Sequence, residues 1–245
     1  MQDKLNFDSF YKEHANQTLQ WLQTDLEEIY NKNLRENYDK LQRYGWIEQH
    51  IDYKFNSAGF RCKEFTNDPS IMFLGCSYTC GVGLPLETIW AELVAKEFDM
   101  SCANLGIGGG AADTAFRLCL GYIDAIRPKA VVYLPPPGVR LELDIDNKMV
   151  PINVSSYKGN DYNILIRQFF KLWLIGETNN DCLNRMKNSM AINHLCATRN
   201  IPFIELDADR LITLDYARDL MHVGKESHMS FSRYVVDEIK RVTSW

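Results

Sequence analysis

Residues 71–81, Ile-Met-Phe-Leu-Gly-Cys-Ser-Tyr-Thr-Cys-Gly, decide the fold of this chain. Four apolar residues run into Gly75, and small and hydroxyl-bearing residues follow as far as Gly81. A short apolar run bounded by glycine is typical of a strand that is buried on both faces, as in a parallel sheet. Open α/β sheets place their ligand sites at the carboxyl ends of such strands. The stretch therefore predicts that Ser77 projects from a tight turn at a strand end. The alternative is an ordinary βα turn with a hydrogen-bonded serine.

The rest of the chain alternates between the two periodicities of strand and helix. Short apolar runs predict further strands at 102–105, 130–134 and 202–206, and amphipathic stretches predict helices at 89–98, 112–126, 162–173, 180–198 and from about 225 onward. In the helix at 180–198 the predicted apolar stack is Leu183, Met186, Met190, His194 and Leu195. Residues 139–160 are polar and irregular, which predicts a loop. Such alternation predicts an α/β fold with a parallel sheet and helices on both of its faces.

The first part of the chain precedes the predicted α/β domain and has a different pattern. We expect residues 1–68 to form a helical and extended N-terminal extension packed on the main α/β domain, residues 69–245, with no Pro- or Ser-rich linker between them. Residues up to about 45 predict an amphipathic helix, with an apolar stripe of Leu19, Leu22, Leu26 and Tyr30, and 47–55 predict a strand. Such an extension is a candidate lid or association surface, and therefore a candidate contact between copies in a homo-oligomer.

Composition and charge exclude several classes of protein. The chain has 245 residues, of which 46% are hydrophobic and 24% charged, with a net charge of −5 and a pI near 5.6. An acidic balance without a Lys/Arg run argues against a nucleic-acid surface. No apolar segment approaches the length of a membrane span, and the N-terminus lacks a signal-peptide pattern, which predicts a cytoplasmic protein. Seven scattered cysteines predict reduced thiols, and the close pair Cys76 and Cys80 has no second pair to complete a metal site, so no metal is expected.

Two further segments carry residues suited to chemistry. Gly108, Gly109 and Gly110 follow a predicted strand and precede a helix, where backbone N–H groups suit a developing negative charge, although glycines also simply allow the backbone to turn. Asp219 precedes His222 by three residues. A carboxylate at that spacing can fold back onto the imidazole Nδ1, which fixes the tautomer and leaves Nε2 for a serine hydroxyl.

The chain resembles the SGNH/GDSL hydrolase family over about residues 70–240. Residues 75–79 (Gly-Cys-Ser-Tyr-Thr) look like the family's first block, Gly-Asp-Ser-x-x, and residues 104–109 (Asn-Leu-Gly-Ile-Gly-Gly) look like its second. Residues 219–222 (Asp-Leu-Met-His) match its last block, and 56–61 resemble a segment often found just ahead of the first. The resemblance implies a flavodoxin-like three-layer α/β/α sandwich, and hydrolysis of an ester through a covalent acyl-serine.

This resemblance, together with the residues themselves, assigns roles for a serine esterase. Ser77 is the expected nucleophile, His222 the general base and then acid, and Asp219 the residue that orients the imidazole. The backbone N–H groups of Ser77 and Gly109 are the expected oxyanion donors. No cofactor is expected, and the expected partner is a small-molecule or carbohydrate-linked ester.

The sequence departs from the family pattern at two places. Cys76 stands where the family has an aspartate that mainly shapes the turn. The third block, usually Gly-x-Asn-Asp with an asparagine in the oxyanion hole, falls on residues 134–140, Leu-Pro-Pro-Pro-Gly-Val-Arg. Proline has no N–H to donate. Arg140 is the first side chain beyond the prolines with fixed N–H donors, and we expect it to contact the oxyanion or an anionic substrate group. The alternative is a surface ion pair with Glu142 or Asp144.

Other functions compete with this assignment. Gly106-x-Gly108-x-x-Ala111 fits part of a dinucleotide fingerprint, but the proline run stands where the ribose-binding acid belongs. A flavin-phosphate loop at Ser77 would leave the Asp-x-x-His segment unexplained. Cys76 is a rival nucleophile and His228 a rival base. The damaged third block also allows a binding or structural protein that keeps the fold with little or no turnover.

Overall fold

The structure, a computed structural model, describes residues 6–145, 148–153, 164–175 and 177–245. Its centre is a four-stranded parallel sheet of β3 (Ser70–Leu74), β4 (Ser101–Asn104), β5 (Ala130–Tyr133) and β8 (Phe203–Glu205). The strand order is β4-β3-β5-β8, so the chain runs first to one side of β3 and then to the other. Ligand sites of doubly wound sheets lie at the carboxyl edge beside such a reversal.

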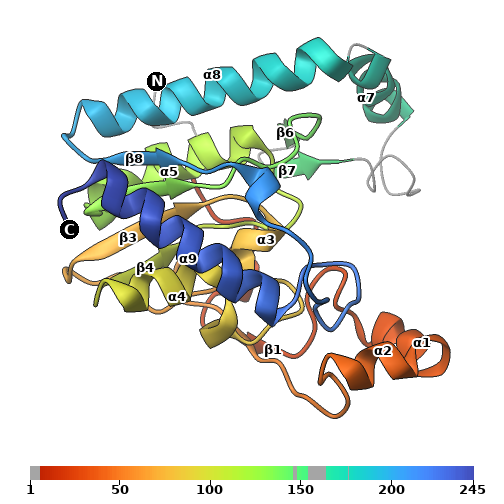
Figure 1. The fold of residues 1–245 in the computed structure, drawn as a ribbon. Coiled ribbons are helices and arrows are strands. Elements are labelled where there is room, and N and C mark those ends of the chain that lie inside the picture. The colour runs from red at the N-terminus through yellow and green to blue at the C-terminus, as the bar shows by residue number, and fades with distance from the viewer. Residues whose placement is uncertain (1–5, 146–147, 154–163, 176) are drawn as a thin grey trace.

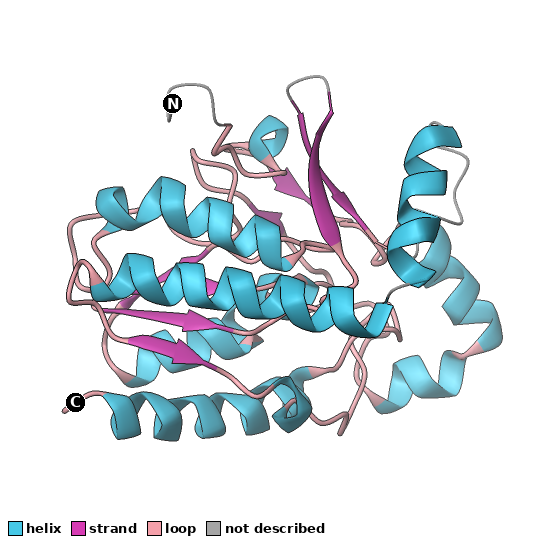
Figure 2. Ribbon diagram, turned by 90° about the horizontal axis from the view of Figure 1, so that it is seen from above, coloured by secondary structure: helices cyan, strands magenta, loops and turns pink. Residues whose placement is uncertain are grey.

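Helices cover both faces of the sheet. They are α4 (Trp90–Glu97), α5 (Ala112–Ile126), α8 (Glu177–Ala197) and α9 (Lys225–Val242), with a one-turn helix α3 (Ser77–Cys80) directly after β3. Helix α7 (Ile164–Ile175) packs against α8 beyond the sheet (Figure 1). α5 and α8 lie on one face, and α4 and α9 lie on the other (Figures 1 and 2). The expected α/β fold with a parallel sheet between two helical layers is confirmed, and its predicted strands and main helices lie within a few residues of their expected bounds.

The core is divided by the sheet into two apolar layers. Side chains of a strand alternate between faces, and every residue of β3 is buried. Ile71 and Phe73 pack with residues of α4 and α9, whereas Met72 and Leu74 pack with residues of α5 and α8. Burial on both sides explains why this strand has an unbroken apolar sequence.

Two sequence predictions in the second half of the chain are wrong. Instead of a loop, two antiparallel strands pair here, β6 (Leu141–Ile145) and β7 (Lys148–Ile152); residues 146–147 and 154–160 of the predicted loop lie outside the described residues. Most of the apolar stack predicted for α8 does not face the core, because Leu183, Met186 and Met190 are all more than half exposed; Leu195 is partly buried and packs against the core. The buried positions of α8 are Asn184, Asn188, Ile192 and Cys196. The two asparagines donate to Asp113 of α5, so hydrogen bonds replace apolar contacts at this end of the helix.

The N-terminal extension is also less helical than predicted. It contains a 3-10 turn (Lys12–His14), β1 (Thr18–Leu19), α1 (Glu27–Glu36), α2 (Tyr38–Arg43) and β2 (Tyr53–Lys54). Leu19 lies in β1, which pairs antiparallel with β2 and interrupts the expected stripe. Asn16 and Gln23 have φ values of 61° and 57°, in the left-handed region that ends a helix. Of the expected strand at 47–55, residues 53–54 form β2, whereas residues 47–48 form a turn and the others have no regular secondary structure.

The extension is tied to the main fold by a buried ion pair. Nη2 of Arg218 lies 2.7 Å from Oδ2 of Asp25, and both side chains are almost fully buried. The Tyr53 hydroxyl donates to the same carboxylate, and the guanidinium lies over the ring of Trp21 at 4.2 Å. Removing one partner of such a pair leaves a buried charge and costs about 3–5 kcal/mol. Because Arg218 precedes Asp219, these contacts hold the extension against the Asp-x-x-His segment.

Among the described helices, none has both the length and the hydropathy needed to cross a bilayer. The described residues also contain no group of three or more His, Cys, Asp or Glu side chains arranged to hold a metal ion. All seven cysteines are free thiols.

Candidate active site

Ser77 lies on α3 at the carboxyl end of β3, where two glycines define the turn. Gly75 has a φ of 158°, and a Cβ placed on it would lie 2.2 Å from Oγ1 of Thr79, so the turn closes against α3. Gly81 ends the short helix in the left-handed region, with φ of 77°. Ser77 is 6% exposed. Within the described residues its hydroxyl has no hydrogen-bond partner, so the turn fixes the position of Oγ while its hydrogen-bonding capacity remains unused.

The glycine loop after β4 packs against this turn. Asn104 donates to the carbonyl of Thr79 at 2.7 Å, and a Cβ on Gly106 would lie 2.7 Å from the backbone nitrogen of Cys80. The Gly108 N–H donates to the Tyr11 hydroxyl at 3.0 Å. By contrast, the N–H groups of Ser77 and Gly109 have no acceptor among the described residues. These two donors are therefore available to an oxygen atom in the site, whereas the Gly108 donor is not.

Asp219 and His222 form the pair that the sequence spacing predicts. Nδ1 of His222 lies 2.6 Å from Oδ2 of Asp219, while Oδ1 accepts the backbone N–H groups of Met221 and His222. Leu220 has a φ of 54°, which folds the carboxylate back over the following residues. Burial raises the pKa of Asp219, but the hydrogen bond and charge of His222, together with the hydrogen bond from Thr24, lower that pKa below its ordinary value. The carboxylate is thus held ionised beside the imidazole.

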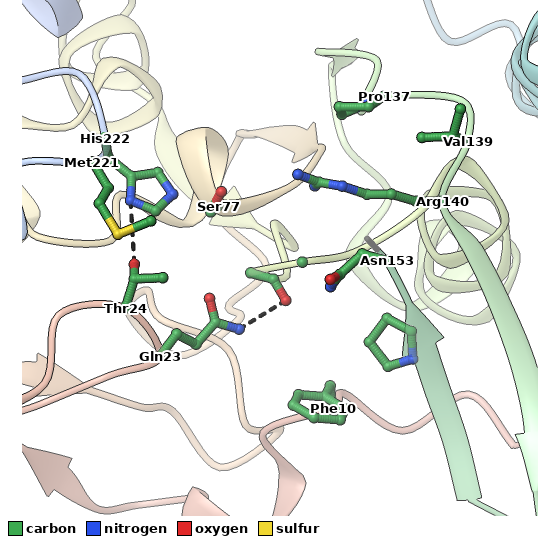
Figure 3. A pocket seen from close by; sticks show the side chains of 13 residues that line it. Phe10, Gln23, Thr24, Ser77, Pro137, Val139, Arg140, Asn153, Met221 and His222 are labelled. Carbon is green, nitrogen blue, oxygen red and sulfur yellow. Dashed lines mark hydrogen bonds between the residues drawn. The ribbon is translucent and has the colours of Figure 1, made fainter. Parts of the chain in front are cut away.

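Ser77, Gly109 and His222 line the same cavity, which has a volume of about 500 Å³ (Figure 3). The other lining residues come from six separate segments of the chain: Phe10, Gln23, Thr24, Gly108, Pro137, Val139, Arg140, Pro151, Asn153 and Met221. A cavity of this size holds a small organic ligand. The nucleophile, base and oxyanion donor expected from sequence are therefore brought together, while Asp219 lies behind His222.

The structure separates Ser77 from the rival nucleophile Cys76. Cys76 is 2% exposed and lines a second cavity of about 260 Å³, on the other side of the turn, together with Tyr78 and the proline run. His222 does not line that cavity. Adjacent residues on the turn thus point into different spaces, and the one that shares a space with the Asp219–His222 pair is the serine.

His228 is placed as a core residue rather than a base in the cavity. It is 1% exposed, and its Nδ1 accepts the backbone N–H of Trp90 at 3.0 Å, at the start of α4. Burial, with smaller contributions from the charges of His222 and Arg61, lowers the pKa of His228 to about 3. A neutral imidazole that accepts a helix N–H has a structural role.

Arg140 lines the cavity, and Figure 3 shows its guanidinium directed toward Ser77 from the side opposite His222. The alternative surface pair is not formed. Glu142 instead accepts two hydrogen bonds from Arg117, at 2.7 and 2.8 Å. Within the part of the chain that the structure describes, the guanidinium donates one long hydrogen bond, from Nη1 to the carbonyl of Gly110 at 3.4 Å.

Three cavity residues have no signal in the sequence. The Thr24 hydroxyl donates to Oδ2 of Asp219 at 2.6 Å and lies 3.4 Å from Nδ1 of His222. Gln23 donates to the carbonyl of Gly108 at 2.7 Å, and Asn153 lines the wall beside Gly109. Thr24 and Gln23 belong to the N-terminal extension, so this extension forms one wall of the cavity.

No protein-family model and no curated protein matches the chain. Among solved structures, the chain is similar to the psychrotrophic esterase EstA from Pseudoalteromonas sp., with 14% identity and a TM-score of 0.38 over 71% of this chain and 98% of that one. It is similar to the lipase/acylhydrolase from Enterococcus faecalis, with 14% identity and a TM-score of 0.34 over 71% and 97%. A third is Est24, a carbohydrate acetylesterase from Sinorhizobium meliloti, with 10% identity and a TM-score of 0.36 over 71% and 100%.

Proposed function

We propose that this protein is a serine-dependent hydrolase that acts on ester bonds. The observation that carries the proposal is that Ser77 shares one cavity with an imidazole whose Nδ1 is held by a buried carboxylate 2.6 Å away. The arrangement leaves Nε2 of His222 as the basic atom, because Nδ1 is engaged by Asp219. A small-molecule or carbohydrate-linked ester fits a cavity of about 500 Å³.

The reaction proceeds in two acyl transfers. His222 Nε2 takes the proton of the Ser77 hydroxyl while Oγ bonds to the ester carbonyl carbon. The tetrahedral intermediate then collapses, the bond to the alcohol oxygen breaks, and the imidazolium gives its proton to that oxygen. A water molecule next gives a proton to His222 and attacks the acyl-serine. The bond from carbon to Oγ breaks, Ser77 regains its proton, and the acid product leaves.

The oxyanion of each tetrahedral intermediate requires donors that already point at its position. The Ser77 and Gly109 N–H groups are two backbone donors of the cavity lining that have no acceptor among the described residues. Removal of one donor from such a site typically costs about 10² to 10³ in rate. The missing third-block asparagine therefore predicts a slower enzyme, unless another cavity donor replaces that side chain.

The test of this proposal is covalent labelling combined with turnover. An activated phosphonate should modify Ser77, as seen by mass spectrometry, and Ser77→Ala should lower hydrolysis of 4-nitrophenyl acetate by roughly 10³-fold or more. Cys76→Ser is the matched control, since Cys76 occupies the neighbouring position of the same turn. Loss of activity in Cys76→Ser with retention in Ser77→Ala would reverse the assignment of nucleophile. A folded wild-type protein that neither reacts nor turns over any ester would instead be a binding protein with this fold.

A further inference from the structure

The described lining of the cavity beside Ser77 includes cationic side chains but no carboxylate. Of its described lining residues, only Arg140 and His222 carry side chains that become cationic, and no carboxylate is among them. The remaining polar groups are amides and hydroxyls. An arginine guanidinium stays protonated at any physiological pH. The cavity therefore offers a permanent positive charge to whatever occupies it.

Three carboxylates around this part of the site, those of Glu142, Asp113 and Asp219, are bound by other side chains, whereas the buried Oδ1 of Asp181 on α8 has no hydrogen-bond partner among the described residues. Glu142 is bound by Arg117, and both side chains are at least nine-tenths buried. Asp113 is bound by two asparagines and a lysine of α8, and Asp219 is bound by His222. Within the described residues Arg140 makes no ion pair. No carboxylate among the described residues that line the cavity therefore pairs with its charge.

The backbone of Arg140 is held while its guanidinium remains available. Its N–H donates to the carbonyl of Pro137 at 3.1 Å, and its carbonyl accepts from Asn184 at 3.2 Å. Among the described residues the guanidinium has one hydrogen-bond partner, the Gly110 carbonyl at 3.4 Å, so most of its five N–H donors have no acceptor there. A half-buried cation with free donors favours an anion that can accept two parallel hydrogen bonds.

We propose that the acyl part of the substrate carries a carboxylate, which Arg140 binds. This inference rests on the proposed function. His222 must give its proton to the departing alcohol, so the alcohol lies on the imidazole side of Ser77. The acyl chain then extends toward the opposite side, where Figure 3 shows the guanidinium. The substrate class is the monoester of a dicarboxylic acid.

The test compares charged and neutral acyl groups with the same leaving group. The probes are the 4-nitrophenyl monoesters of glutaric and adipic acid and the corresponding methyl 4-nitrophenyl diesters, with uncatalysed rates subtracted. We expect the ratio of kcat/KM between monoester and diester to fall about 10- to 100-fold in Arg140→Gln. Arg140→Lys should recover part of that ratio, because it keeps the charge without the planar fork.

Two controls separate this proposal from other roles of the charge. Arg185→Gln removes the same charge from the neighbouring cavity, and an equal fall in the ratio there would overturn a direct contact. If Arg140→Gln slows monoester and diester equally, Arg140 stabilises the oxyanion and the inference is wrong. In 4-acetoxybenzoate the carboxylate is on the leaving alcohol and not on the acyl group. If the enzyme prefers the charged compound only in the comparison of 4-acetoxybenzoate with its methyl ester, the anion lies on the alcohol side and the inference is also wrong.

A binding measurement distinguishes failure of this inference from failure of the proposed function. Monomethyl adipate and dimethyl adipate are titrated into Ser77→Ala by calorimetry. If monomethyl adipate binds Ser77→Ala but no longer binds the double variant Ser77→Ala/Arg140→Gln, the anion site is supported even if the wild-type chain hydrolyses no ester. Equal binding of both compounds would overturn the anion site while leaving esterase activity intact.

Discussion

Thr24→Val tests whether the N-terminal extension positions the proposed catalytic pair. Valine has nearly the shape of threonine but lacks the hydroxyl, which donates to Oδ2 of Asp219 at 2.6 Å. The same carboxylate also accepts from Nδ1 and the backbone N–H of His222 and from the N–H of Met221. The substitution therefore removes one of four hydrogen bonds and leaves the other three.

The expected loss follows from that count. A hydrogen bond to a charged group contributes about 1.5–3 kcal/mol, and 1.4 kcal/mol corresponds to a factor of ten. Because three hydrogen bonds still hold Asp219, we expect the lower end of this range, about a tenfold fall in kcat with KM little changed. Complete loss of the orienting carboxylate costs about 10⁴ in a serine protease, so Thr24→Val should remain far more active than Asp219→Asn. The pKa of Asp219 should rise, since the Thr24 hydrogen bond lowers it.

The assay is steady-state hydrolysis of a 4-nitrophenyl ester by wild type, Thr24→Val and Thr24→Ser, with thermal unfolding of each. Thr24→Ser keeps the hydroxyl and is expected to retain most of the activity. A Thr24→Val enzyme with unchanged kcat but a lower Tm would refute a positioning role and leave a structural one. Equal losses in both variants would mean that the methyl group, and not the hydrogen bond, is important.

Three further outcomes are expected. Gly109→Ala should lower kcat about 10²-fold. Gly109 has a φ of 71°, and a Cβ there would lie 3.1 Å from Asn153 Nδ2, so the backbone N–H proposed as an oxyanion donor must move. A normally folded variant with wild-type kcat would show that this N–H is not used. His222→Ala should abolish ester turnover, whereas His228→Gln should lower thermal stability and keep turnover; the reverse pattern would move the base to His228. Since the pKa of His228 is lowered to about 3 in the folded chain, the unfolded chain gains a proton that the native chain does not as the pH falls from about 6.5. The contribution of neutral His228 to the free energy of unfolding is therefore complete above that pH and is lost as the pH falls toward 3. The expected loss is about 2 kcal/mol between pH 7 and 5. Denaturant unfolding should show this loss in wild type but not in His228→Gln.

The strands and the turn beside Ser77 could be predicted because their signals are local. An unbroken apolar run such as β3 is stable as a strand when both of its faces are buried. Gly75 marks the point where the chain turns. The Asp219–His222 pair is local as well, since the carboxylate reaches an imidazole three residues away through a single turn. Periodicity was misleading at α8, where Leu183 and Met190 suggested the packed face but Asn184 and Asn188 are buried by hydrogen bonding to Asp113.

The walls of the cavity were decided by tertiary structure alone. Thr24 is 195 residues from Asp219 in sequence, and no spacing rule relates two groups that meet only because the buried Asp25–Arg218 pair fixes the extension against the loop. Arg140 had two possible partners by sequence, and the choice depended on Arg117 of a separate helix taking Glu142. The sequence by itself determined which local segments carry the proposed nucleophile, base and oxyanion donors, because those features depend on neighbouring residues. Which side chains surround the substrate depended on long-range packing, which a linear pattern does not encode.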